Sequence, residues 1–139
     1  MIKLKLPNLI SGQCFLLYLI LLALDSSAQT ADWISPSFLD TIRNPVVLNT
    51  KTLEESKKIY LKTCWACHGE NGEGDGPASV QLNPKPANHT LPVVQNQSDG
   101  ALFWKISTGR GAMQPYSKVL TVQQRWELVH FIRSLKQKQ

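Results

Sequence analysis

The 139-residue sequence has little cysteine, no long run of basic residues and no apolar stretch of membrane-spanning length. Three cysteines are too few for a disulfide-dense scaffold. The net charge is +5, but lysines and arginines are scattered along the chain, so no nucleic-acid partner is expected. What the sequence does have, a 42% hydrophobic fraction with four Trp and four Phe, is typical of one small globular domain.

The first 28 residues have the layout of a secretory signal peptide. Two lysines precede an apolar stretch from Cys14 to Leu24, and small residues follow up to Ala28. This stretch is much shorter than the roughly 20 residues that a membrane-spanning helix needs. We therefore expect residues 1–28 to be a signal peptide cleaved after Ala28, with an uncleaved membrane anchor as the alternative. The protein is then exported to the periplasm, either soluble or tethered to the membrane.

The remaining residues predict an irregular arm over 29–51 and a helical domain over 52–139. A capping-box pattern at Thr52 and Glu55 precedes apolar residues at helical spacing, which predicts a helix over about 53–67. Residues 71–96 are rich in Gly, Pro, Asn and Gln and predict one long loop, with a turn of helix near 78–82.

Two further helices are expected after this loop. One is capped by Ser98 or Asp99 and stops at Gly109, and the last runs from a capping box at Thr121 and Gln124 to near residue 136. No pair of alternating strands is present in the pattern. The expected fold class is all-α, with three to four helices and long loops.

The segment Cys64-Trp65-Ala66-Cys67-His68 carries the chemistry. On a helix, positions i, i+3 and i+4 share a face, so both thiols and the imidazole point the same way. C-x-x-C-H is the attachment signal of c-type haem, in which the thiols bind the two vinyl groups and the imidazole ligates the iron. Three alternatives are weaker. A thioredoxin-like redox pair does not explain the placement at the end of a helix, and a zinc site lacks four ligands at motif spacing. A plain disulfide leaves His68 unexplained.

The ligand on the other side of the iron decides between functions. A methionine there favours electron transfer at raised potential, a histidine favours a lower potential, and an open position favours ligand binding or catalysis. Met113 lies in a Gly-rich loop between two expected helices, and we favour it as the sixth ligand over a role as core filler. His89 and His130 are the fallback ligands, each more simply explained as a surface or packing residue.

The residues from about 52 to 136 resemble a small monohaem class I cytochrome c. The resemblance rests on Ser56–Tyr60 before the haem motif, 72–77 after it, 99–106, the Gly109–Met113 loop and 125–133, in this order. It implies a cytochrome c fold around one covalent haem c, with the first and last helices crossing so that Tyr60 lies against Phe131 and Trp126 packs nearby.

The same resemblance implies a partner for the proximal imidazole, namely the carbonyl of Pro77, which would accept the Nδ1 proton of His68. The chain departs from relatives at Ser56, where glycine is common, and at Gln114, where proline often follows the ligand methionine.

We expect one-electron transfer between redox partners of an exported respiratory or dehydrogenase chain, and no enzymatic step of its own. Partners are expected to be acidic at the docking surface, because basic residues flank the presumed haem crevice. These residues are Lys57, Lys58, Lys62, Lys85, Lys105, Arg110 and Lys118. The alternative function is a haem enzyme, or a gas- or peroxide-binding haem protein, with an open sixth position.

Overall fold

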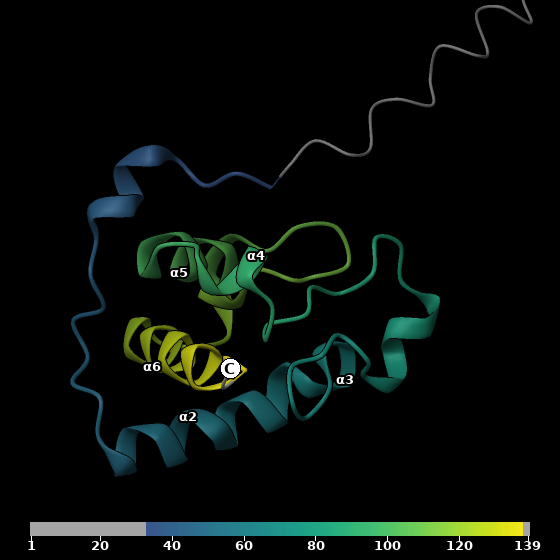
Figure 1. Cartoon of the computed structure of the whole chain (residues 1–139), viewed down its shortest axis with the longest axis horizontal. Coiled ribbons are helices and arrows are strands. Elements are labelled where there is room, and N and C mark those ends of the chain that lie inside the picture. The colour runs from purple at the N-terminus through teal and green to yellow at the C-terminus, as the bar shows by residue number, and fades with distance from the viewer. Residues whose placement is uncertain (1–32, 138–139) are drawn as a thin grey trace, which may run out of the picture. The chain divides into compact units, whose positions relative to one another are not determined.

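A computed structural model describes residues 33–137 and shows a helical fold (Figure 1). The helices are η2 (Ser37–Thr41), α2 (Thr50–Thr63), α3 (Trp65–His68), η3 (Pro77–Gln81), α4 (Pro92–Gln95), α5 (Asp99–Thr108), η4 (Tyr116–Lys118) and α6 (Val122–Ser134), where η denotes a 3-10 helix. Within 33–137 no strand forms, and the single β-type contact is an isolated bridge between Arg110 and Met113. The all-α prediction is confirmed.

The start of α2 differs from the sequence prediction. The N-cap is Asn49, whose side chain accepts a hydrogen bond from the backbone N–H of Thr52 at 2.9 Å. The predicted capping box of Thr52 and Glu55 is therefore wrong, and Glu55 instead pairs with Lys58 at 3.0 Å. Asparagine in extended backbone is as good an N-cap as threonine, so the cap nearer the arm begins the helix earlier.

The two later helices begin as predicted. The side chain of Ser98 accepts from the N–H of Ala101 at 3.1 Å and caps α5. At α6, Thr121 and Gln124 form both bonds of the capping box, at 3.2 Å and 2.9 Å. The helix ends at Ser134, slightly before the predicted end.

The core forms where α2 packs against α6 (Figure 1). The ring centroid of Tyr60, which is fully buried, lies 4.7 Å from that of Phe131. Trp126 stacks on Phe103 of α5 at 4.0 Å, so α6 is sandwiched between aromatic groups of two helices. Ser56 is also fully buried, and its hydroxyl donates to the Leu53 carbonyl at 2.9 Å. The helix crossing thus accommodates a serine at this position.

The long loop over residues 71–96 is more ordered than its composition indicates. The predicted turn of helix is present as η3, and α4 is an additional short helix that the sequence pattern did not indicate. Lys85 stabilises the end of η3, since its ammonium donates to the carbonyls of Ser79 and Val80, both at 2.9 Å. Hydrogen bonds between loop segments therefore take the place of regular secondary structure.

The arm before α2 packs on the helical domain. The Asn44 side chain donates to the carbonyl of Trp126 at 2.8 Å, and His130 Nε2 lies 2.7 Å from the carbonyl of Val46. Residues 34–139 form one compact unit, so the arm beyond residue 34 belongs to the same body as the helices. The predicted signal peptide lies outside the described residues. No helix within 33–137 combines the length and apolarity needed to cross a membrane.

Candidate haem-binding site

The two cysteines of the motif lie at the end of α2 and within α3, the turn that follows it. Cys64 interrupts the expected single helix, and the amides of Cys67 and His68 both bond to its carbonyl, at 3.2 Å and 3.0 Å. Both thiols are free and half-buried, so no disulfide joins them. Burial raises the pKa of Cys64 to about 11, although a hydrogen bond from Thr63 opposes the shift.

His68 has one ring nitrogen engaged and one available. Its Nδ1 lies 2.9 Å from the carbonyl oxygen of Ala87 and donates to it, which leaves the Nε2 lone pair for a metal. Burial lowers the pKa of His68, against the opposing effect of the Ala87 bond, so the imidazole is neutral at pH 7. A neutral, oriented imidazole is the form that ligates iron.

The Nδ1 partner corrects the expectation for Pro77. The first part of the loop packs on the backbone of α3 instead, since Gly74 N–H bonds to the carbonyl of His68 at 2.8 Å and Gly76 N–H to that of Cys67 at 3.2 Å. Pro77 then begins η3. The imidazole is met by the returning part of the loop at Ala87, so a carbonyl ten positions later than Pro77 orients the ring.

Met113 lies in a tight turn that brings it to the core. Arg110 and Met113 exchange backbone hydrogen bonds of 2.8 Å and 3.0 Å. A Cβ at Gly109, where φ is +63°, would overlap the Met113 carbonyl, so this close turn requires glycine. Met113 and Cys64 both pack against the same core cluster, which contains Tyr60 and Tyr116. The methionine loop and the cysteine motif thus both contact this core cluster.

Tyr116 joins these two segments directly. Its hydroxyl donates to the carbonyl of Thr63 at 2.6 Å, across 53 residues of sequence. Thr63 is the last residue of α2 and precedes Cys64, while Tyr116 follows Met113 by three positions. A residue that the sequence analysis did not single out therefore links the two ligand-bearing segments. An aromatic residue in a turn carries no sequence signal for such a bond.

The two fallback histidines are not placed opposite His68. The ring of His89 stacks on that of His68, with centroids 4.2 Å apart and planes 20° apart. Ligands on opposite faces of one iron point nitrogen to nitrogen, which stacked rings cannot do. His130 instead contacts the arm through the carbonyl of Val46. In the described part of the chain no group of three or more His, Cys, Asp or Glu side chains is arranged to hold a metal ion.

Comparisons with known proteins identify the family. Residues 53–136 match the family model described as "Cytochrome c". A chain of the Kuenenia stuttgartiensis reducing HAO-like protein complex Kustc0457/Kustc0458 superposes with a TM-score of 0.57 and 28% identity, covering 69% of this chain and 50% of its own. This chain thus spans only half the length of that neighbour.

A second solved structure, the KustC0563 c-type cytochrome, gives a TM-score of 0.52 and 26% identity, covering 59% of this chain and 98% of its own. No significant match was found among curated protein sequences. Since the family model covers more than half of the sequence, including Cys64 and Cys67, the chain belongs to the cytochrome c family and its cofactor is a covalently attached haem c.

Proposed function

We propose that the chain carries single electrons as a monohaem c-type cytochrome with His68 and Met113 as the axial ligands of the iron. The observation that carries the proposal is that Met113, which is half-buried, packs against the same core cluster as Cys64. Cys64 begins the motif that ends in His68, whose ring is oriented by the Ala87 carbonyl. A haem bound here supplies an iron that takes up and releases one electron. A histidine–methionine ligand pair favours a raised potential.

The protein's own residues hold the site together. Cys64 and Cys67 would anchor the haem, Ala87 orients His68, and the turn at Gly109 delivers Met113. Electron transfer needs no proton donor or acceptor, and the bonds described above orient ligands instead of moving protons. The role of these residues would therefore be to hold the haem and its ligands in fixed positions.

We further propose that the chain works in an exported, periplasmic respiratory or dehydrogenase system. The apolar leader pattern of residues 1–28 supports export. The structural neighbour of 28% identity comes from a protein complex, which supports redox proteins as partners. The scattered basic residues around the ligand loops favour partners with an acidic docking surface.

The test is the optical spectrum of the protein matured in a host with haem attachment machinery. We expect c-type bands and, in the ferric form, the weak far-red band of sulfur-to-iron charge transfer. Met113→Ala should abolish that band and keep the haem, whereas Val119→Ala, an exposed side chain in a nearby turn, should leave it unchanged.

Two results would contradict the proposal. A protein without covalent haem would exclude a cytochrome. Covalent haem without the far-red band, together with rapid cyanide or carbon monoxide binding by the unsubstituted protein, would instead support the alternative of a haem enzyme or a gas- or peroxide-binding protein.

A further inference from the structure

A second histidine ring covers the face of the proposed iron ligand. His89, from the returning part of the long loop, stacks on His68 with ring centroids 4.2 Å apart and an interplanar angle of 20°. Only 9% of His89 is exposed. A buried imidazole costs more than an apolar side chain of similar size unless its polar atoms are paired. The position of this ring therefore calls for an explanation.

The ring of His89 is held by Tyr60, at the crossing of α2 and α6. The Tyr60 hydroxyl lies 3.1 Å from the carbonyl of Gly69 and 3.4 Å from Nδ1 of His89. A tyrosine hydroxyl has one proton, and the carbonyl can only accept, so that proton goes to Gly69. Nδ1 of His89 is then the donor to the tyrosine oxygen. Burial lowers the pKa of His89 to about 3, so the ring is neutral.

The backbone of His89 is held at both ends. Its N–H donates to the carbonyl of Gly72 at 2.6 Å, and its carbonyl accepts from Gln95 Nε2 at 2.6 Å. The same amide nitrogen donates to the carbonyl of Ile132 in α6 at 2.7 Å. A Cβ at Gly72, where φ is +75°, would lie 3.1 Å from the His89 Cβ, so the two loop segments pack without space between them.

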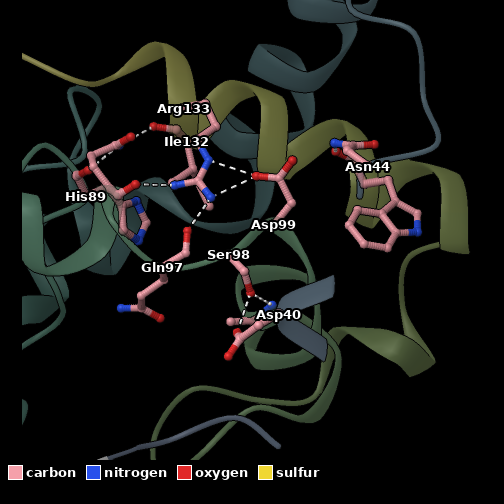
Figure 2. A network of polar contacts seen from close by, with 11 residues as sticks. Asp40, Asn44, His89, Gln97, Ser98, Asp99, Ile132 and Arg133 are labelled. Carbon is pink, nitrogen blue, oxygen red and sulfur yellow. Dashed lines mark hydrogen bonds and ion pairs between the residues drawn. The ribbon is translucent and has the colours of Figure 1, made fainter. Parts of the chain in front are cut away.

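The backbone of Gln95 is itself held by α6. Arg133 donates to the carbonyl of Gln95 at 2.7 Å and to the carboxylate of Asp99 at 2.8 Å and 2.9 Å (Figure 2). Figure 2 shows Arg133 between Asp99 and the segment that contains His89. The His89 ring thus belongs to the rigid part of the molecule, although it lies in a loop.

We propose that His89 is a positioning residue that fixes the plane of the His68 ring. The Ala87 carbonyl holds His68 at one edge only, which leaves the plane of the ring free to rock about that hydrogen bond. A flat ring stacked on its face removes this freedom. An aliphatic side chain of similar volume would fill the space without defining a plane. This inference rests on the proposed function, in which His68 is the proximal ligand.

The test is the proton NMR spectrum of the ferric holoprotein. The hyperfine shifts of the four haem methyl groups report the direction of the axial imidazole plane. In His89→Leu we expect their order or spread to change, and in His89→Phe, which restores a flat ring, to return toward the unsubstituted pattern. Tyr60→Phe, which removes the hydroxyl that holds His89, should shift the pattern in the same direction as His89→Leu, by less.

His130→Leu is the matched control, because this histidine contacts the arm at Val46 and not the proposed ligand. An unchanged methyl pattern in His89→Leu would overturn the inference. Easier unfolding of this variant would not rescue it, because a loss of stability alone would show only that His89 fills space in the core. If His89→Leu does not mature, an unchanged pattern in Tyr60→Phe decides against it. Absence of c-type bands in the unsubstituted protein would instead reject the proposed function.

Discussion

At the scale of single residues, the hydroxyl of Tyr116 is the direct link between the methionine loop and the cysteine motif. Its bond to the Thr63 carbonyl is 2.6 Å long, and Tyr116 itself is buried. Burial raises the pKa of Tyr116, so the hydroxyl keeps its proton beyond the usual value near 10. The stabilisation from this group is therefore fully present below pH 10 and is lost only as the pH rises through the raised pKa.

We predict that Tyr116→Phe weakens the binding of Met113 to iron without removing it. The lost bond is worth about 1 kcal/mol. If the loss of Met113 from the iron at alkaline pH is coupled to one proton, its midpoint shifts by about 0.7 pH unit. The far-red band should therefore disappear at a lower pH in the variant during alkaline titration. Ser117→Ala, an exposed neighbour in η4, serves as the control. Coincident titration curves for the variant and the unsubstituted protein would show that the link has no role.

What the sequence predicts at this scale depends on distance along the chain. Cys64, Cys67 and His68 follow from spacing within one turn, and their placement on the α2–α3 segment is as expected. The Nδ1 partner of His68 is not a local property, because it depends on where a 26-residue loop returns, and the expectation of Pro77 was therefore wrong. The bond of Tyr116 to Thr63 was missed for the same reason, since the two residues are 53 positions apart. His89 was named as a fallback ligand or a surface or packing residue, and its contact with Tyr60, 29 positions away, was not foreseen.

At the scale of elements, Arg133 joins the end of α6 to the α4–α5 junction. Besides Asp99, its guanidinium donates to the carbonyls of Gln95 and Gln97, at 2.7 Å and 2.5 Å. Both side chains of the ion pair are about 30% exposed, with values of 27% and 32%. A planar guanidinium with several partners is more rigid than a lysine pair and holds the segment that contains His89 against α6.

We predict that Arg133→Gln destabilises the holoprotein by about 1–3 kcal/mol, because carbonyl groups and a carboxylate lose a charged donor. The measurement is denaturant unfolding followed by haem absorbance. Lys58→Gln is the matched control, since the Lys58–Glu55 pair lies on the exposed face of α2 and should contribute nothing measurable. Equal midpoints for the two variants would contradict the prediction.

Helix positions were predictable where the signal is local. Both later N-caps are those expected, because Ser98 and Thr121 each bond to an amide three positions on. The start of α2 was predicted too late because Asn49 and Thr52 are both good caps, and packing of the arm against α6 places the chain so that the earlier one is used. The short helix α4 has too few residues for a periodic pattern.

At the scale of the whole molecule, charge is distributed unevenly along the chain. In residues 100–137 the basic residues are Lys105, Arg110, Lys118, Arg125, Arg133 and Lys136, and Glu127 is the one acidic residue. In residues 52–76, by contrast, the lysines are outnumbered by Glu54, Glu55, Glu70, Glu73 and Asp75. The positive charge expected to attract acidic partners is therefore concentrated in the part of the sequence that carries Met113, and the lysines of α2 lie among acidic residues.

This asymmetry makes a prediction about electron-transfer rates. Arg110→Gln with Lys118→Gln removes two charges close to Met113, and two unit charges about 10 Å from a singly charged reagent contribute roughly 0.8 kcal/mol in water, about a fourfold change in rate. Stopped-flow reduction by an anionic reagent at low ionic strength should slow by that factor, and the difference should disappear as salt screens the charges. A cationic reagent should react faster with the same variant.

The matched control removes the same amount of charge from α2, with Lys57→Gln and Lys58→Gln. These lysines lie on α2 and not beside the Met113 loop. If the reagent docks at that loop, this variant should change the rates with either reagent much less, because the contribution of a charge falls with distance. If both double variants slow the anionic reagent equally, net charge alone governs the rate. Only a larger effect from the Met113 side would identify that side as the docking surface, because steering depends on where the charge lies as well as on how much there is.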